Sequence, residues 1–330
     1  MPRPLRAAIV GLGTAVPEKV LTNADFEKFL DTSDEWITKR TGIRERHIAS
    51  ESQTTGTLGT IAARNALADA NITPQDIELI IVATVTPDMI MPSTACCIQE
   101  TLGATDVPAF DLGAACSGFI YAVSVASKFI ETGTYKRVLV IATETLSKFS
   151  DYTDRGSCVL FGDGAGAVVL EATEDEDRGV LYSVLHADGN GWDFIHVPAG
   201  GSRNPATLET VENRDHFIKM RGRDVYKFAV EKMQWLLGNC MEKCNMTVDD
   251  IDMVVPHQVN SRIIASAASK FDFPQDKVFV NIDIYGNTSA ASIPLAMQQA
   301  RDEGRIGPGS TLMLVAFGAG LTWAGAILKL

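Results

Sequence analysis

Apolar positions form short continuous runs along the chain, separated by alanine-rich stretches and polar turns. The runs at residues 79–83, 138–141 and 312–315 contain no polar position. Strands in the middle of layered α/β proteins are covered on both faces, so such runs favour buried strands over alternating surface strands. The alanine-rich stretches, which favour helices, are residues 58–70, 120–130 and 262–269.

The sequence also resembles itself at a fixed spacing. Residues 71–81 read like residues 245–255, a shift of 174 positions, and the same shift places 138–141 on 312–315. A shift of 172 positions places Asp111 on Asp283. A repeat of this length predicts two copies of one α/β unit rather than a solenoid of short units.

We therefore predict two halves, residues 1–172 and residues 173–330, joined near the polar, acidic segment 171–179. Two halves that face each other would bring strand ends and helix starts to both sides of one cleft. Residues far apart in the sequence would meet there. Residues 197–214, rich in Gly, Asn, Pro and Thr, are predicted to form a loop.

Composition narrows the classes of function. The 330 residues carry a formal net charge of −12, which argues against nucleic-acid binding through bulk electrostatics. No apolar run reaches the ~18 residues of a membrane-spanning helix, and the short apolar start reads as a strand rather than a signal peptide. The six cysteines form no C-x-x-C pair and have no close histidine. We expect a cytoplasmic protein with reduced cysteines, no metal site and no membrane contact.

Three polar residues follow predicted strands at turns. The first is Cys116, in the run FDLGAACSGF at residues 110–119, where a strand ends and a helix begins. At a helix N-terminus the macrodipole would lower the thiol pKa from about 8.5 toward 7, and backbone N–H groups could hold an oxyanion. A small, buried, structural cysteine is the alternative. The strand-to-helix position favours a nucleophile.

The other two residues come from the second half. His257 directly follows a core strand, unlike the other four histidines, although a structural histidine is the alternative. Asn287 lies in the run YGNTSAAS, which falls near the Cys116 segment in the repeat, although an N-cap alone would explain it. The glycine-rich turn at residues 316–323 would let the backbone approach a ligand, close a hairpin, or do both.

Seven short runs carry a family resemblance. They are TSDEWI at 32–37, RTGIRERH at 40–47, AACSGF at 114–119, TDRG at 153–156, FGDGAGA at 161–167, PHQ at 256–258 and GNTSAAS at 286–292. Taken together and in order, they resemble β-ketoacyl-[acyl-carrier-protein] synthase III, the condensing enzyme that starts fatty-acid synthesis. The resemblance covers nearly the whole chain, from about Ile9 to Leu330.

The resemblance implies an α/β, thiolase-like fold with a duplicated five-layer α-β-α-β-α architecture, in a homodimeric acyltransferase. It also implies a catalytic triad of Cys116, His257 and Asn287. Cys116 would take the acyl group of an acyl-CoA, and the acyl-enzyme would condense with malonyl-acyl carrier protein as carbon dioxide leaves. Backbone N–H groups of Cys116 and Ala319 would hold the oxyanion, while neutral His257 and Asn287 would stabilise the enolate. No metal or redox cofactor is implied.

Binding residues follow from the same resemblance. Positions that contact coenzyme A in the family match Trp36, Arg40, Arg155, Gly222 and Asn260. The basic residues among 39–47 would recognise its phosphates, or would be a solvated helix end. The family's docking patch for the acidic carrier protein matches Lys227, Arg262 and Lys270.

The chain departs from the family at three points. Ala319 replaces a glycine of the usual triple-glycine turn, where only the backbone N–H is needed. Val259 and Ser261 stand where Ala and an aliphatic residue are common. Met91 stands where an aromatic residue often closes the partner's acyl pocket, so the preferred acyl chain length stays open.

Three alternatives fit parts of the sequence. The glycines at residues 11–13 and 162–166 suggest a dinucleotide-dependent oxidoreductase, but the first run lacks a third glycine and the second leads into a strand. A non-catalytic carrier-binding homologue would not need the triad. A starter condensing enzyme of secondary metabolism, of polyketide or quinolone type, is not separated from fatty-acid synthesis by the sequence.

Overall fold

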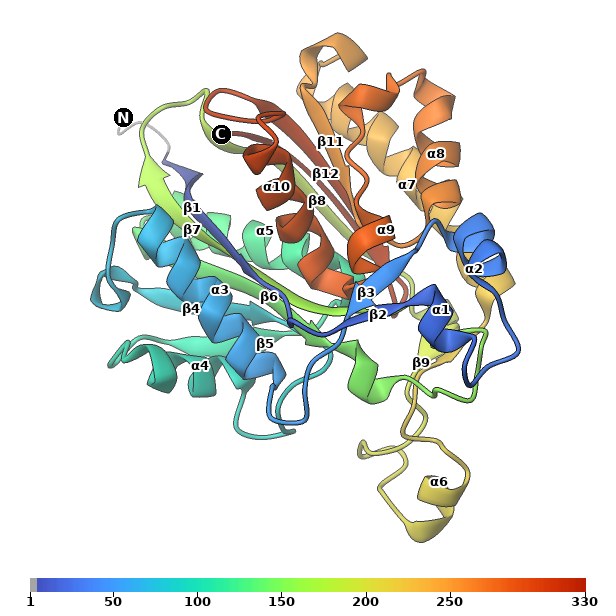
Figure 1. Cartoon of the computed structure of the whole chain (residues 1–330). Helices are drawn as coiled ribbons and strands as arrows, with labels where there is room; N and C mark the ends of the chain where they lie inside the picture. The colour runs from blue at the N-terminus through green and yellow to red at the C-terminus, as the bar shows by residue number, and fades with distance from the viewer. Residues whose placement is uncertain (1–4) are drawn as a thin grey trace.

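The computed structural model describes residues 5–330, so the first four residues of the predicted N-terminal half lie outside it. Two mixed β-sheets stack with helices between and outside them (Figure 1). The first sheet has the strand order β1-β7-β6-β4-β5. Its strands are β1 (Arg6–Ala15), β4 (Leu79–Ala83), β5 (Ala109–Leu112), β6 (Arg137–Thr145) and β7 (Asp163–Thr173).

The second sheet has the strand order β11-β12-β13-β8. Taken from β8 to β11, it repeats the arrangement of the first sheet from β1 to β4, with one strand fewer. Its strands are β8 (Gly179–Ala187), β11 (Met253–Pro256), β12 (Thr311–Gly318) and β13 (Thr322–Lys329). The parallel pair β11 and β12 corresponds to the parallel pair β4 and β6. Val278 makes a single parallel bridge to Val254 beside β11, in the place that β5 holds in the first sheet.

Six helices complete the layers. They are α3 (Thr55–Asp69), α4 (Thr94–Leu102), α5 (Gly118–Glu131), α7 (Gly222–Cys244), α8 (Ser261–Ala268) and α10 (Ser292–Asp302). Helices α3 and α4 cover the outer face of the first sheet, α5 and α10 lie between the sheets, and α7 and α8 cover the second (Figure 1). The five-layer α-β-α-β-α architecture that the family resemblance implies is therefore confirmed.

The repeat extends to the backbone of individual turns. Ala115 and Ser289, which are 174 positions apart, both adopt the left-handed conformation, with φ of 46° and 51°. Asn71 and Asn245, at the same separation, do so with φ of 55° and 53°. Non-glycine residues seldom adopt this conformation, so its recurrence marks equivalent turns in two copies.

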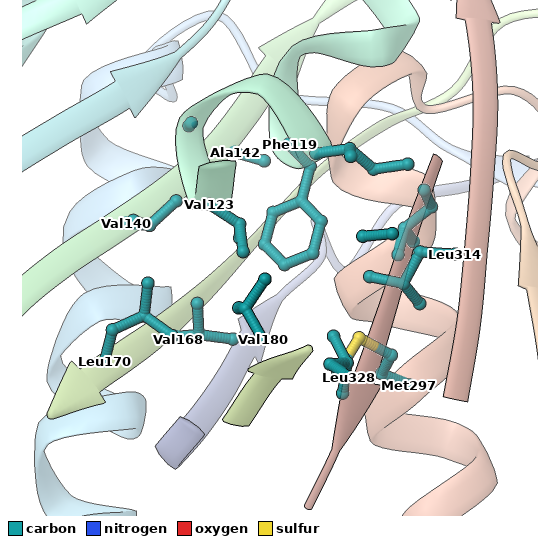
Figure 2. Close-up of a cluster of buried hydrophobic side chains, with 14 of the residues drawn as sticks. Phe119, Val123, Val140, Ala142, Val168, Leu170, Val180, Met297, Leu314 and Leu328 are labelled. Atoms are coloured by element: carbon teal, nitrogen blue, oxygen red, sulfur yellow. The ribbon is translucent and has the colours of Figure 1, made fainter. Parts of the chain in front are cut away.

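The centre of the molecule is apolar. Helices α5 and α10 contribute side chains to a core that both sheets enclose (Figure 2). Phe119 and Val123 of α5 are fully buried in it, and Met297 of α10 and Leu314 of β12 reach it from the other half (Figure 2). Two further cores lie under the outer helices. Because α5 begins beside Cys116, this packing fixes the position of that residue.

The remaining helices and strands are short. They are β2 (Val20–Thr22), α1 (Asn23–Phe26), α2 (Asp34–Thr41), β3 (Glu45–His47), β9 (Ile195–His196), α6 (Leu208–Glu212), β10 (Lys219–Met220) and α9 (Ile282–Tyr285). Helix α6 projects away from the body of the molecule (Figure 1), so the predicted loop at 197–214 contains a short helix. Ser33 caps the start of α2 by accepting a hydrogen bond from the Trp36 N–H.

Replacement of Phe119 by alanine should lower the free energy of unfolding by about 3–5 kcal/mol, because it opens a cavity between the sheets. Urea denaturation followed by circular dichroism measures the change. Phe29→Ala is the matched control, since Phe29 is 53% exposed and its loss opens no central cavity. Equal losses in the two variants would contradict the central role of the α5 core.

Candidate active site

A cavity of about 300 Å³ lies where the two halves meet, and Cys116, His257 and Asn287 all line it. The structure thus brings the three predicted polar residues together from separate parts of the sequence. Most of the remaining wall is apolar, with Leu146, Phe149, Phe161, Ile195, Ile218 and Phe317 among the lining residues. A cavity with apolar walls and a few convergent polar groups is the usual form of a small-molecule site.

Cys116 lies in the turn that joins β5 to α5. A short 3₁₀ turn at Ala115–Ser117 connects the strand to the helix, as the sequence predicts. Gly318 at the end of β12 packs directly against this turn, and a Cβ atom there would lie 2.7 Å from the Cys116 backbone nitrogen. Only glycine permits this close approach of the two halves.

Burial raises the pKa of the Cys116 thiol to about 12, and the nearby Glu144 carboxylate contributes in the same direction. The exposed part of Cys116 faces the apolar cavity, where a thiolate is poorly hydrated. The predicted fall of the thiol pKa toward 7 was therefore wrong in direction. The helix macrodipole favours the thiolate, whereas the loss of hydration in the apolar cavity favours the neutral thiol.

His257 directly follows β11, and its backbone N–H donates to the Val315 carbonyl at 2.8 Å. The ring is fully buried, which lowers its pKa to about 3 and keeps it neutral. Its Nδ1 lies 2.7 Å from Ser292 Oγ, while its Nε2 has no hydrogen-bond partner within residues 5–330.

Ser292 favours one tautomer of the ring. Its Oγ accepts the Gln258 backbone N–H at 3.3 Å, and within residues 5–330 His257 Nδ1 is the one recorded acceptor for its own proton. A ring that accepts at Nδ1 carries its proton on Nε2. His257 therefore presents a neutral N–H donor to the cavity.

Asn287 presents a second donor. Its Oδ1 accepts the Ser289 backbone N–H at 2.9 Å, which leaves the amide N–H groups to donate. Its backbone is held on both sides, since its N–H donates to Leu160 O at 2.8 Å and its carbonyl accepts from the Gly162 N–H at 3.0 Å. The N-cap interpretation of Asn287 was wrong, because Thr288 precedes the turn at Ser289–Ala291, which has no side-chain cap, and the Asn287 side chain instead accepts from the backbone two residues on.

Ala319 lines the same cavity, at the start of the turn between β12 and β13. The two strands pair antiparallel up to Gly318 and Thr322, so the segment is also the hairpin that the sequence allowed. The hairpin interpretation is therefore confirmed, while approach of this backbone to a ligand stays a prediction. The backbone of Ala319 therefore reaches the cavity close to the Cys116 turn.

A groove of about 640 Å³ adjoins the cavity. Its lining includes all five residues that the family resemblance assigns to coenzyme A, namely Trp36, Arg40, Arg155, Gly222 and Asn260. Leu160 and Met220 line both the groove and the cavity, so the two spaces adjoin along shared walls. The Arg40 and Arg155 guanidinium groups lie 5.1 Å and 5.4 Å from the Trp36 ring centroid, on an aromatic and cationic platform.

Only part of the basic cluster at residues 39–47 faces the groove. Arg46 is fully buried and donates to the carbonyls of Leu21 and Val159, and His47 Nδ1 lies 2.5 Å from the Pro17 carbonyl. Of this cluster, Arg40 alone lines the groove among the described residues. Arg46 instead ties the N-terminal elements to the segment before Leu160, because its guanidinium donates to Leu21 and Asn23 on one side and to Val159 on the other.

Sequence reasoning missed four residues around these spaces. Arg223 and Tyr226 line the groove at the start of α7, next to the predicted Gly222. Ser289 and Ser292 belong to the run 286–292 that the resemblance already included, but their roles depend on hydrogen-bond directions. The adjacency of Arg223 to Gly222 was a usable signal for the first pair.

The predicted carrier-docking residues lie on one side of the molecule. Lys227 is exposed on α7, Arg262 is exposed on α8, and Lys270 follows α8 in the next turn. Helices α7 and α8 pack against each other, and Arg262 also lines the groove. Met91 is 80% exposed and does not line this chain's own cavity.

The alternative of a dinucleotide site is not supported by the glycines. Gly11 and Gly13 lie within β1, where a Cβ atom would clash with the backbone of α3 at Ala66. Gly164 and Gly166 lie within β7 and do not open a helix. Within residues 5–330 no cluster of metal-ligating side chains occurs, and no helix is long and apolar enough to span a membrane.

Comparison with known proteins gives consistent matches. The family model for 3-oxoacyl-[acyl-carrier-protein] synthase III matches residues 110–189, and the model for its C-terminal part matches residues 241–330. Beta-ketoacyl-[acyl-carrier-protein] synthase III of Caldanaerobacter subterraneus is 53% identical, covering 98% of each chain. The protein of that name from Clostridioides difficile is 51% identical, also over 98% of each chain.

Solved structures agree with these sequence matches. The 3-oxoacyl-[acyl-carrier-protein] synthase III of Aquifex aeolicus superposes with a TM-score of 0.90 at 46% identity, covering 98% of this chain and 100% of that one. The priming β-ketosynthase of the R1128 polyketide pathway superposes with a TM-score of 0.91 at 34% identity, covering 100% and 98%. Both matches extend over both sheets.

The His257 ring should remain neutral, with its proton on Nε2, from pH 8 down to about pH 5. Burial lowers its pKa from 6.5 to about 3, so the folded protein binds this proton only near pH 3. The unfolded chain already binds it below pH 6.5, so His257 lowers the stability of the folded state as the pH falls below 6.5. Nitrogen chemical shifts of ¹⁵N-histidine-labelled protein report both features. Ser292→Ala should change the balance of the two tautomers. A doubly protonated His257 at pH 6 would contradict this arrangement.

Proposed function

The chain belongs to the 3-oxoacyl-[acyl-carrier-protein] synthase III family, and we propose that it joins an acyl-CoA primer to malonyl-acyl carrier protein through an acyl thioester on Cys116. The reaction is a decarboxylating condensation that yields a β-ketoacyl-acyl carrier protein and initiates fatty-acid synthesis. The convergence of Cys116, His257 and Asn287 on one cavity, which adjoins an arginine-lined groove, supports this proposal best.

In the first half-reaction, Cys116 attacks the thioester carbonyl of the acyl-CoA. The backbone N–H groups of Cys116 and Ala319 receive the negative charge of the tetrahedral intermediate. Loss of one such donor typically costs about 3–4 kcal/mol of transition-state stabilisation. Coenzyme A then leaves through the groove, and the acyl group stays on Cys116 in the apolar cavity.

In the second half-reaction, the malonyl thioester carbonyl lies between two donors, His257 Nε2–H and the Asn287 amide. Carbon dioxide leaves and the two donors stabilise the enolate oxygen. The buried, neutral state of His257 supports this role, because a neutral N–H stabilises the enolate without protonating its carbon. These steps use protein donors alone, so they require no metal or redox cofactor.

The groove suits the nucleotide end of coenzyme A. Four arginines line it, Arg40, Arg155, Arg223 and Arg262, and they suit phosphate groups, while Trp36 offers a stacking surface for a base. Gly222 and Asn260 lie between this end and the cavity in the proposed path of the pantetheine arm. The Asn260 amide donates to the Arg40 carbonyl at 2.9 Å, which supports a link between α8 and α2 at this point.

We also propose a cytoplasmic homodimer in which residues 1–172 carry the nucleophile and residues 173–330 carry His257 and Asn287. Six free cysteines suit a reducing compartment. Met89, Ile90 and Met91 are exposed between β4 and α4, and a second copy would cover this apolar segment. Met91 would then close the acyl pocket of the partner.

The structural match to a polyketide priming synthase supports a second candidate function, the priming of polyketide synthesis. Its TM-score, 0.91, is similar to the 0.90 of the Aquifex aeolicus synthase III, whereas sequence identity to the relatives named beta-ketoacyl-[acyl-carrier-protein] synthase III is higher, at 51–53% against 34%. Intact-protein mass spectrometry with a panel of acyl-CoAs, followed by malonyl-acyl carrier protein, would show which primers load and extend.

The triad variants should separate the two half-reactions. Cys116→Ala should show no mass increase with acetyl-CoA, whereas His257→Ala and Asn287→Ala should still acylate Cys116 and lose condensation by about 10²–10³-fold, the effect expected of a lost oxyanion donor. Intact-protein mass spectrometry measures loading, and release of labelled carbon dioxide from malonyl-acyl carrier protein measures the second step. An acyl group on the Cys116→Ala protein would refute the nucleophile assignment.

Charge reversal on α8 should weaken carrier docking. Arg262→Glu should raise the dissociation constant for acyl carrier protein about tenfold, which corresponds to roughly 1.4 kcal/mol. Titration by surface plasmon resonance at low and high salt measures it, and binding to the unmodified chain should weaken as salt rises. Arg64→Glu on α3, in the opposite outer layer, is the matched control. Equal effects from both variants would contradict a docking site at α7 and α8.

A further inference from the structure

A buried carboxylate that the mechanism above does not use lies behind the nucleophile. Glu144, near the end of β6, is fully buried, and burial raises its pKa to about 7. Its hydrogen-bond donors are all neutral, namely the hydroxyls of Thr84, Thr86 and Ser289 and the backbone N–H groups of Val85 and Thr86. A buried carboxylate without an opposite charge is costly to maintain, which points to a functional reason for it.

One of these donors also lies beside the nucleophile. Ser289 Oγ donates to Glu144 Oε1 at 3.1 Å, and Ser289 lines the same cavity as Cys116, where hydrogen bonding from its side chain lowers the pKa of the thiol against the effect of burial. A hydroxyl has one proton, so Ser289 cannot donate to both neighbours at once. When Ser289 donates to Glu144, its oxygen can accept the thiol proton. When Ser289 donates to a Cys116 thiolate, a protonated Glu144 can donate to its oxygen. Transfer of two protons, one from Cys116 to Ser289 and one from Ser289 to Glu144, converts the first arrangement into the second.

We propose that Glu144 accepts the proton of Cys116 through the Ser289 hydroxyl as the sulfur attacks the acyl-CoA. This inference rests on the proposed function, in which Cys116 is the nucleophile. The S–H bond breaks as its proton moves to Ser289 Oγ, and the Ser289 proton moves to Glu144 Oε1. The sulfur electron pair forms the new bond to the carbonyl carbon, and the coenzyme A thiolate that leaves takes a proton from water.

Glu144 keeps its proton while Cys116 is acylated and returns it at the end of the cycle. When the enolate carbon attacks the acyl group, Cys116 leaves as a thiolate and regains its proton from Glu144 through Ser289. During decarboxylation Glu144 is therefore neutral. An ionised carboxylate at this place would oppose the enolate charge, because like charges repel strongly in a poorly hydrated site.

His257 is a poor candidate for this role. Its Nδ1 is occupied by Ser292, and its Nε2 carries a proton in the neutral tautomer, so it offers no free lone pair to the thiol. The other titratable groups on segments packed around Glu144 are Asp88 after β4 and Asp163 at the start of β7. Asp163 accepts hydrogen bonds from Ala49 and Ser147, and Asp88 from Gly56 and Thr54. Neither of them contacts Ser289.

The test compares acetylation of Cys116 by acetyl-CoA in single turnovers between pH 6 and pH 9, read by rapid-quench mass spectrometry. In the unmodified chain the rate should rise through about pH 7, where Glu144 ionises, and then stay level. Glu144→Gln and Ser289→Ala should each be slower by about 100-fold at pH 7, the usual scale of general-base assistance. Their rates should then rise about tenfold per pH unit, as for an unassisted thiol.

Two controls separate a proton relay from a structural role. The double variant should be no slower than either single variant, because both changes interrupt one path. Asp163→Asn removes a second fully buried carboxylate of the same sheet, and it should keep the unmodified pH profile.

An unmodified profile in Glu144→Gln and Ser289→Ala, or an equal loss in Asp163→Asn, would overturn the relay. Acetylation of Cys116 in the unmodified chain would meanwhile leave the proposed function intact. A chain that never acetylates Cys116 would overturn the proposed function, and the relay with it.

Discussion

The site depends on the direct contact between the Gly318 backbone and the Cys116 turn. No side chain separates the end of β12 from the start of α5, and a single added carbon would lie 2.7 Å from the Cys116 nitrogen. This contact sets the depth of the cavity, because it fixes Ala319 beside the nucleophile. It also brings the end of β12, from the second half, against the Cys116 turn of the first half. Strand ends from both sheets therefore face the same space. Apolar packing around α5 and α10 holds that point rigid.

One physical condition, the lack of water in the cavity, has a different consequence for each ionisable group in it. It raises the pKa of Cys116 and Glu144 and lowers that of His257, because in each case the charged form loses hydration. At pH 7 Cys116 and His257 are therefore neutral, and Glu144, with a pKa of about 7, can be neutral or ionised. For His257 this is an advantage, since a neutral N–H donor is what an enolate needs. For Cys116 it is an obstacle, and the Ser289 and Glu144 hydrogen bonds offer a way around it.

The sequence predicts the layers and the convergence of residues better than it predicts their ionisation. Continuous apolar runs and a repeat of 174 positions are properties of the chain alone, so they identify the strands, place Asn287 opposite Cys116 and mark His257 as a residue at a strand end. The triad itself follows from the family resemblance. The pKa of Cys116 depends on which walls surround it, and that depends on tertiary packing. The same holds for Glu144 and Ser292, whose roles come from the directions of hydrogen bonds. Arg46 illustrates the limit, since its charge suggested a surface and its surroundings are the core.

Duplication explains how these parts came to lie together. The 3₁₀ turn that carries Cys116 and the turn at Ser289–Ala291 are equivalent in the repeat, and both begin with a left-handed residue. In the first copy this residue is Ala115 and the nucleophile follows it. In the second copy it is Ser289, which lines the cavity with the nucleophile and donates to Glu144. Two copies of one turn have thus diverged, so that one carries the thiol and the other a hydroxyl beside it. Ser292, at the position equivalent to Gly118, adds the group that orients His257.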